Sequence, residues 1–419
     1  MKIIKFFALF IVLAQTSVAA NLAELQKAAI ENRQVVEKFK ANLEKSQEEE
    51  TIAKSSYFPS ADITYTMNSL DDTTAFENEE NSVAYGALTW NLFNGFKDKY
   101  DIASAKFQRQ AEGLRLSGIK QDIQLAVALK YIEIFSRKAN LQLEQDNYNT
   151  LLKAHKDSQS RFDVGLIDKN ELLKFKVDLD NAKISLKRAE ADLAKSMQQL
   201  QREINTDVSL EELSFAEFEE LPNISSYDDL KKTMMENRTE LRVLEELAEA
   251  AQMQVKASYA DYYPKLDATT SYRKYADDFR SSDGTSTNEE LRSQLVMSVN
   301  IFDGFNKGSG VRRAKLEKQI IKHDIEELKL DLDTDLKNLL LDYEVSIENT
   351  DVSLSSIEQA EENLRITDLK YKEGLETETN LLDAIANLTR AKFNHIIAKF
   401  DVYNNYYRIT RAVEGFEAL

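Results

Sequence analysis

The 419-residue chain contains no cysteine and only three prolines, three histidines and one tryptophan. The absence of cysteine excludes disulfides, thiolate catalysis, thiolate metal sites and lipid attachment at an N-terminal cysteine. The histidines lack the paired spacing of a zinc site, and the acidic run from Asp331 has Leu336 where a calcium loop needs glycine. No nucleophile elbow or phosphate-binding loop is present. An enzyme is therefore not expected, nor is a cofactor or a bound metal.

Long apolar runs are also missing. No stretch of about 18 apolar residues occurs, so no transmembrane helix is expected. Residues 1–20 carry Lys2 and Lys5, an apolar stretch from Phe6 to Leu13 and small residues at the end, as a cleavable secretory signal does. A membrane role is then possible only through β-strands, whose signature is about ten residues of alternating polarity.

The chain has fewer basic residues than acidic ones, 54 against 72. The formal net charge is −18, and it becomes −20 when Lys2 and Lys5 leave with the signal. Such a charge opposes binding to nucleic acid, whose phosphates need a basic surface. It fits either a strongly solvated surface or an acidic passage that handles cations.

The main feature that is present is an internal duplication. Residues 25–59 align without gaps on residues 230–264 at an offset of 205, and both segments contain Glu-Asn-Arg and end in aromatic-Pro. Residues 161–182 align on residues 370–391 at an offset of 209. This period is too long for a solenoid repeat and indicates two equivalent halves, residues 21–210 and 227–419.

Each half is predicted to contain the same parts in the same order. A helix of about 35 residues ends at Pro59 or Pro264, because proline lacks an amide donor and restricts the residue before it. Two strand-like segments follow, then a helix of almost 70 residues, a glycine and another helix of about 35 residues. At 1.5 Å per residue the long helix would measure about 100 Å. The spacing of a coiled-coil seam is followed by Leu332, Leu336, Leu339 and Tyr343.

The halves are joined by a predicted linker, residues 211–226. The linker is acidic and contains Pro222. Ser226 and Asp229 have the spacing of a capping box for the helix that follows.

Two predicted hairpins, residues 60–93 and 265–302, alternate apolar and polar side chains with the period of a strand. They end in similar phrases, WNLFNGF from Trp90 and VNIFDGF from Val299. Singly, each hairpin fits a small sheet packed on a helix. Four such strands behind a secretory signal favour a barrel with an apolar outside and a wet inside. Since closure needs about eight strands, the chain must oligomerise, and three copies would supply twelve.

Together these parts resemble the TolC-type outer-membrane efflux protein family over nearly the whole mature chain. The resemblance is carried by the two aromatic-Pro helix ends, by the two repeated phrases, and by YKEGLETETNLLDAIANLTRA from Tyr371. The last is similar to the family's Tyr-x-x-Gly…Leu-x-Asp-Ala…Leu-x-x-Ala signature. The resemblance implies a mainly α fold with a transmembrane β part. A homotrimer would form a twelve-stranded β-barrel in the outer membrane of a Gram-negative bacterium, continued by a twelve-helix α-barrel of coiled-coil helices in the periplasm.

The resemblance also implies a function, a passive exit duct of a tripartite efflux or type I secretion system. Its partners would be outer-membrane lipid, a periplasmic adaptor (membrane fusion) protein and an inner-membrane pump of the RND, ABC or MFS type. Drugs, metal ions and secreted proteins use the same kind of duct, so the substrate stays open. The alternative is a trimeric coiled-coil surface protein without a pore, although a fibre has no need of two equal strand pairs in one chain.

A pore gate is implied at the periplasmic end. The family's two acidic-ring positions fall on Asn380 and Asp383, so a double ring of carboxylates becomes a single one. Glu171 falls where the family can have a carboxylate tied to an arginine, but the arginine position holds Glu376. These two glutamates would repel, which predicts other closing contacts or a looser gate. Asp383 could otherwise be an ordinary solvated helix charge.

Two further groups of residues are implied by the resemblance. Tips that contact the adaptor are expected at the helix reversals, where glycine takes the left-handed conformation that ends a helix; a turn without a partner is the alternative. The tip residues are Val164, Gly165, Leu166, Tyr371, Gly374 and Leu375. Hinges between strand and helix are expected at Pro59, Gly95, Pro264 and Gly304.

Overall fold

The computed structural model describes residues 20–74, 79–276, 279 and 289–417. The chain forms two compact units. The strand unit contains residues 37–118 and 237–332, and the tip unit contains the chain up to residue 36 together with residues 119–236 and 333–419. Except for Ala20, the predicted secretory signal lies outside the described residues.

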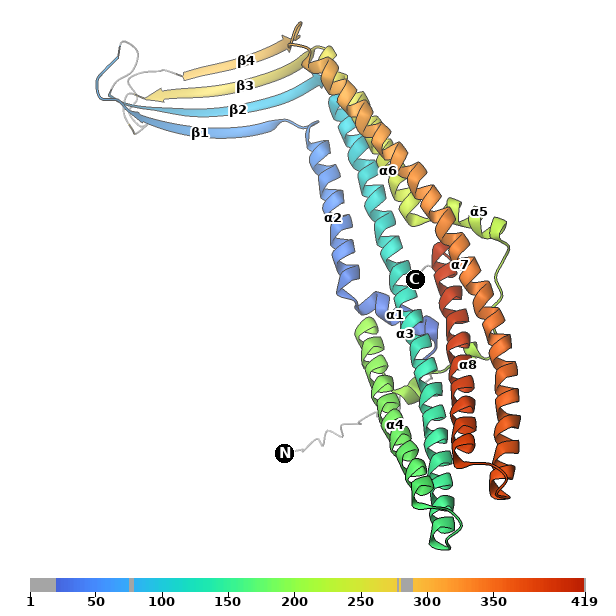
Figure 1. Cartoon of the computed structure of the whole chain (residues 1–419). Coiled ribbons are helices and arrows are strands. Elements are labelled where there is room, and N and C mark those ends of the chain that lie inside the picture. The colour runs from blue at the N-terminus through green and yellow to red at the C-terminus, as the bar shows by residue number, and fades with distance from the viewer. Residues whose placement is uncertain (1–19, 75–78, 277–278, 280–288, 418–419) are drawn as a thin grey trace, which may run out of the picture. The chain divides into compact units, whose positions relative to one another are not determined.

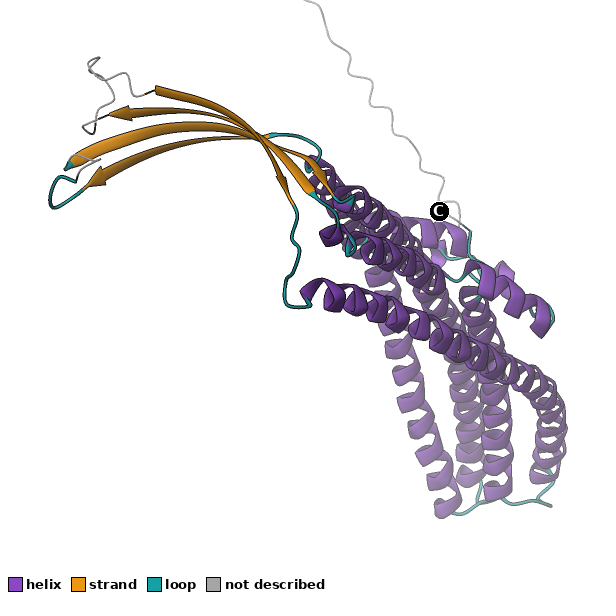
Figure 2. Cartoon of the chain, turned by 90° about the horizontal axis from the view of Figure 1, so that it is seen from above, coloured by secondary structure: helices purple, strands orange, loops and turns teal. Residues whose placement is uncertain are grey.

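The strand unit holds one antiparallel sheet in the order β1-β2-β3-β4, drawn in Figure 1. The first half of the chain supplies β1 (Ser60–Ser69) and β2 (Glu80–Asn94), and the second half supplies β3 (Lys265–Ala276) and β4 (Glu289–Ser298). Figure 2 shows the four strands curving together. Within the described part of the chain, the outer edges of β1 and β4 have no partner strand, so one chain leaves the sheet open on both sides.

The two repeated phrases differ in structure. The second hairpin was predicted to run to residue 302, but β4 ends at Ser298, which pairs with Lys265, the first residue of β3. Residues 299–302 lie beyond the first residue of β3, so they have no residue of β3 to pair with and do not continue the sheet. β2 continues to Asn94 because Asn94 also pairs with Lys265, from the other side of β3 and beyond a register irregularity.

The helix of about 35 residues that was predicted before each pair of strands is wrong, because it is broken in two at the arginine of the Glu-Asn-Arg motif. The first half has α1 (Leu22–Asn32) and α2 (Gln34–Ser55), and the second half has α5 (Tyr227–Asn237) and α6 (Thr239–Ala257). Arg33 is extended, at φ −81° and ψ 128°, and is ion-paired with Glu203; Arg238 has ψ 117° and lies 2.9 Å from the Glu240 carboxylate. These partly buried ion pairs fix the arginines at the breaks.

The long helices agree closely with their predicted lengths. α3 (Lys97–Asp163) and α7 (Asn306–Lys372) have 67 residues each, and are followed by α4 (Lys169–Ile204) and α8 (Glu378–Ala412). On α7 the predicted seam residues Leu332, Leu336 and Tyr343 are buried. None of the described helices combines the length and the apolar character needed to cross a membrane.

The stretch predicted as a linker is a packed part of the tip unit. It contains two short 3-10 helices, η1 (Leu210–Glu212) and η2 (Ala216–Phe218). Phe218 is 1% exposed and lies within 4.7–6.4 Å, between ring centroids, of four other aromatic rings. These rings belong to Tyr131, Phe135, Phe215 and Tyr403. The segment thus supplies the core with an aromatic side chain.

Hydroxyl groups hold the rest of this segment to α7 and α8. The Tyr403 hydroxyl donates to the Glu220 carbonyl at 2.8 Å, and the Tyr343 hydroxyl donates to the Pro222 carbonyl. Burial raises the pKa of Tyr403 to about 12, so its phenol remains a proton donor at physiological pH.

The C-terminal residues dock on α3. The Arg411 side chain is 5% exposed and forms ion pairs of 2.7 Å with Asp122 of α3 and with Glu414. Gln121 and Gln124 donate amide hydrogens to the carbonyls of Phe416 and Glu417. Charged and amide groups of α3 therefore anchor the chain after α8.

Candidate functional site

The two helix reversals have the same backbone geometry. α3 and α7 end before Gly165 and Gly374, whose φ angles are +77° and +71°. The amide of the next residue returns to a helix carbonyl, from Leu166 to Arg161 at 2.9 Å and from Leu375 to Lys370 at 2.8 Å. The predicted left-handed conformation is thus confirmed, and it satisfies carbonyls that the helix ends leave open.

Short caps start the return helices. The Asp168 side chain accepts the Glu171 amide at the start of α4, and the Thr377 hydroxyl accepts the Asn380 amide at the start of α8. The apolar side chains of Val164, Leu166 and Leu375 are each more than 70% exposed. Exposed apolar groups at both reversals are typical of a contact surface.

Tyr371 joins the two reversals within one chain. Its hydroxyl donates to the Glu171 carboxylate at 2.8 Å, and the Arg161 guanidinium lies over its ring at 5.0 Å. Arg161 also donates to the Lys372 carbonyl at 3.2 Å. Burial, and then the Glu171 carboxylate, raise the pKa of Tyr371, so the phenol stays protonated and keeps donating.

Glu171 and Glu376, which were predicted to repel each other at the gate, each accept a hydrogen bond from another residue of the chain. Glu171 accepts from Tyr371, and Glu376 accepts from the Asn380 amide. The two halves are tied instead by an ion pair that the sequence analysis missed, between Lys174 and Glu378. Their hydrogen bond raises the pKa of Lys174 and lowers that of Glu378. The signal for this pair was a lysine and a glutamate just inside the two return helices.

Asp383 lies in a groove of about 470 Å³ formed by α3, α4 and α8. Two more carboxylates line it, Glu144 and Asp178, with Arg390 as the cation among the lining residues. Within the described ranges neither Asp178 nor Asp383 has an ion-pair partner. The single acidic position expected from the sequence is therefore accompanied by two carboxylates from the other half, and one of them, Asp178, lies one heptad after Glu171.

Burial makes these carboxylates harder to ionise. Desolvation first, and the negative charge of Asp383 second, raise the pKa of Asp178. Desolvation also raises the pKa of Glu144, partly opposed by a hydrogen bond from Asn147. Across the described residues, no group of three or more histidine, cysteine or acidic side chains is arranged to hold a metal ion. The groove can attract mobile cations and can take up protons.

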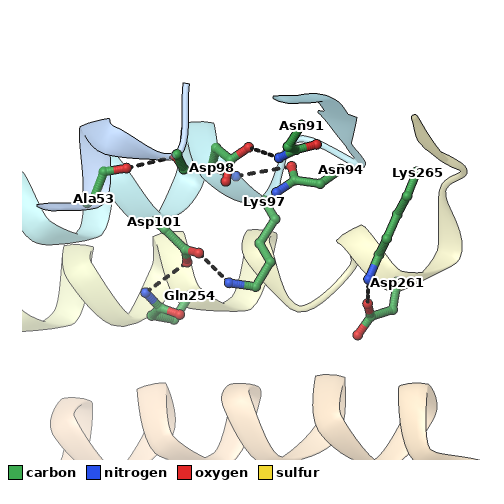
Figure 3. A network of polar contacts seen from close by, with 10 residues as sticks. Ala53, Asn91, Asn94, Lys97, Asp98, Asp101, Gln254, Asp261 and Lys265 are labelled. Carbon is green, nitrogen blue, oxygen red and sulfur yellow. Dashed lines mark hydrogen bonds and ion pairs between the residues drawn. The ribbon is translucent and has the colours of Figure 1, made fainter. Parts of the chain in front are cut away.

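The first strand-to-helix hinge is packed. Gly95 has φ +72°, and a Cβ there would lie 2.3 Å from the Ala260 carbonyl oxygen, so only glycine fits. Figure 3 shows the polar contacts around it. Asn91 donates to the Asp98 carboxylate at 2.8 Å, while Asp101 pairs with Lys97 and accepts from Gln254 of α6.

The second hinge has the same backbone conformation, but its glycine is not packed against another segment. Gly304 has φ +68°, but a Cβ there would meet nothing within 4 Å. Phe302 and Phe305 beside it are both exposed. The other predicted hinge residues, Pro59 and Pro264, directly precede β1 and β3, where a proline excludes helix before each strand.

Comparisons with known proteins agree with this architecture. A family model described as outer membrane efflux protein matches residues 25–206 and 230–414, which covers both halves. A search of curated proteins finds no match.

Solved structures share the fold at low sequence identity. A membrane protein from Pseudomonas aeruginosa is 14% identical with a TM-score of 0.81, over 94% of this chain and 93% of that one. The outer membrane protein VceC from Vibrio cholerae is 15% identical with a TM-score of 0.78, over 94% and 96%. The open state of the Neisseria gonorrhoeae MtrE outer membrane channel is 17% identical with a TM-score of 0.76, over 94% and 89%. The predicted fold class, long helices with a four-stranded β part, is confirmed.

Proposed function

The chain belongs to the outer membrane efflux protein family and is an outer-membrane exit duct of a tripartite efflux system; we propose that three copies of it form one such duct. The family is one of transport ducts rather than enzymes. The observation that carries the proposal is the open edge at β1 and at β4. Joining β4 of one copy to β1 of the next, three times, gives a closed cylinder of twelve strands, whereas four strands cannot close.

In this proposal the strands lie in the outer membrane and the long helices lie in the periplasm. The helix reversals contact a periplasmic adaptor, and the exposed Val164, Leu166 and Leu375 support such a contact because apolar side chains there are otherwise left in water. An inner-membrane pump supplies the energy. The duct itself conducts passively.

Asp383 and Asp178 form the cation-selective gate of this duct. Three Asp383 carboxylates about 8 Å apart around a threefold axis would repel by roughly 2 kcal/mol per pair at an effective dielectric near 20. A passing cation relieves this repulsion and an anion increases it. Asp178 adds negative charge from the same groove, in the place of the missing carboxylate at Asn380.

Planar bilayers containing the purified full chain test the function. We expect a conductance that favours cations, and a cation-to-anion permeability ratio that falls about tenfold in Asp383→Ala, in keeping with a loss of roughly 1.4 kcal/mol. Asp368→Ala is the control, because Asp368 lies on α7 outside the groove and pairs with Lys372. A correctly assembled trimer without conductance at any voltage would rule out the channel.

Selectivity should also depend on pH. Because burial and Asp383 raise the pKa of Asp178, the negative charge of the groove is lost as pH falls, beginning above the usual aspartate range. We expect the cation preference to decline there, and Asp178→Asn to shift the midpoint of the decline to lower pH. Asp180→Asn is the matched control, since Asp180 is exposed on the same helix and pairs with Lys176 at 2.7 Å. An unchanged midpoint in Asp178→Asn would remove Asp178 from the gate.

A further inference from the structure

The second hinge is incomplete in a single chain. Beside it lies a groove of about 490 Å³, whose lining includes Tyr262, Phe302, Phe305, Lys307 and Arg312. The Phe305 side chain is 76% exposed, although it follows Gly304 just as Phe96 follows Gly95. The Phe305 ring meets that of Phe302 edge to face at 5.6 Å and is otherwise largely exposed. A large aromatic side chain left this exposed at φ +72° indicates a missing contact.

The first hinge shows what the missing contact should be. There the start of α3 packs on the end of α6 and on η3 (Ala260–Tyr262). The rings of Phe96 and Tyr263 meet edge to face at 5.9 Å. Further along, the Ser104 hydroxyl donates to the Ala250 carbonyl at 3.2 Å, so the two helices run side by side.

The internal duplication identifies the residues that would make the equivalent contacts at the second hinge. The offset of 209 maps α3 onto α7, and the offset of 205 maps the end of α6 onto the end of α2. Phe96 and Tyr263 become Phe305 and Phe58, and Ala260 against Gly95 becomes Ser55 against Gly304. Phe58 is 71% exposed, so both members of the transferred aromatic pair lack cover in one chain.

A second copy must provide this contact. β1 follows Phe58 directly and β4 precedes the second hinge, and these strands are the opposite edges of the sheet. A four-stranded sheet cannot bend far enough to bring its own edges together. The end of α2 that meets the second hinge therefore belongs to a neighbouring copy.

The two helices carry equal numbers of positive and negative charges where they meet in this arrangement. In the first hinge Asp101 faces Gln254 and Ser104 faces Ala250, so the helices are antiparallel. Transferred by the same offsets, Ser104 against Ala250 becomes Arg313 of α7 against Lys45 of α2, and Asp101 against Gln254 becomes Gly310 against Glu49. Each of the two opposing cations has a carboxylate one turn along its own helix, Glu317 for Arg313 and Glu49 for Lys45, so that Arg313 can reach Glu49, and Lys45 can reach Glu317, diagonally across the interface.

Within one chain these four groups are paired only loosely along their own helices. Arg313 and Glu317 are 3.6 Å apart, Lys45 and Glu49 are 3.5 Å apart, and all four are exposed. They can exchange partners across an interface at little cost, because exposed pairs of this kind are weak.

We propose that the second hinge is completed by α2 of the neighbouring copy. Phe58 of that copy packs on Phe305, and the pairs Arg313–Glu49 and Glu317–Lys45 form across the interface. This inference rests on the trimeric duct proposed above. It adds the residues through which each copy recognises the next.

Cysteine cross-linking tests the contact, and the chain has no native cysteine to interfere. The double variant Phe305→Cys, Phe58→Cys is treated in the full-length trimer with a short bismaleimide. We expect covalent dimers and trimers on a denaturing gel. The matched control is Phe96→Cys, Tyr263→Cys, which should link within one chain and leave only the monomer band.

Charge reversal gives an independent measurement. Arg313→Glu should lower the fraction of trimer severalfold, and adding Glu49→Arg should restore most of it, because the pair is then rebuilt in the opposite sense. Arg365→Glu is the control, because Arg365 lies near the other end of α7, is exposed and pairs with Glu362 at 2.7 Å. Failure of the second substitution to restore the trimer would contradict the Arg313–Glu49 pair.

The outcomes separate this inference from the duct itself. A sample that is trimeric by mass but forms no link between Phe305 and Phe58 would overturn the inference and leave the duct in place. A wild-type sample that never forms trimers would overturn the proposed assembly as a whole.

Discussion

Replacing Phe218 with alanine is expected to raise the rate of proteolysis within residues 205–226 by more than about a hundredfold. Phe218 is 1% exposed and contacts the rings of Tyr131, Phe135, Phe215 and Tyr403. Truncation of a buried phenylalanine costs about 3–5 kcal/mol, and about 3 kcal/mol corresponds to more than a hundredfold change in the open population. Limited proteolysis reports that population when reclosing is fast.

The control for this prediction lies three residues away. Leu221 is 39% exposed, so Leu221→Ala removes apolar surface from the same segment without opening the aromatic core. Equal rates for Phe218→Ala and Leu221→Ala would show that the segment is only tethered to the tip unit rather than packed into it.

Arg411→Ala is expected to release the C-terminal residues from α3. The substitution removes the cation that pairs at 2.7 Å with both Asp122 and Glu414, and the Glu414 side chain is only 8% exposed. Breaking a buried ion pair by removing one partner costs about 3–5 kcal/mol, because a charge loses its compensation in a poorly solvated place. Hydrogen exchange of amides in residues 119–128 and 402–417 should accelerate by more than about a hundredfold.

A matched variant separates the ion pairs from general helix effects. Arg408 lies on the same helix, is exposed, and donates to Asn404 at 2.7 Å. Arg408→Ala should leave exchange nearly unchanged, while Arg411→Lys should recover only part of the protection because lysine lacks the fork that reaches two carboxylates. Full protection in Arg411→Lys would mean that charge alone, without the guanidinium geometry, holds the C-terminus.

The elements that could be predicted from the sequence are those set by local signals. Helical patterns of almost 70 residues predict α3 and α7, and a glycine follows each of them, so both helices and both reversals follow from neighbouring residues. The breaks at Arg33 and Arg238 could not be predicted in this way. The extended backbone at Arg33 is fixed by Glu203, which lies 170 residues away along the chain.

Of the carboxylates that line the groove, only Asp383 was predicted. Asp383 followed from a motif in the second half, whereas Asp178 belongs to the first half and matters because folding brings α4 and α8 to one groove. Lys174 and Glu378 were missed for the same reason. The hydrogen-bond donors of Glu171 and Glu376, which are Tyr371 and Asn380, were not predicted either, because a pattern of charges along the chain does not show such contacts.

The open edges of β1 and β4 also affect how a chain behaves before it assembles. Each of these strands is ten residues long, and at alternate residues its outward amide and carbonyl groups have no partner strand in the described part of the chain. An open edge of this kind is a template for pairing with any other strand. An unassembled copy is consequently prone to aggregate, and the edges that would join three copies in the proposed duct can also pair with the wrong strands. Early cover of β1 and β4 is therefore what would separate productive assembly from aggregation.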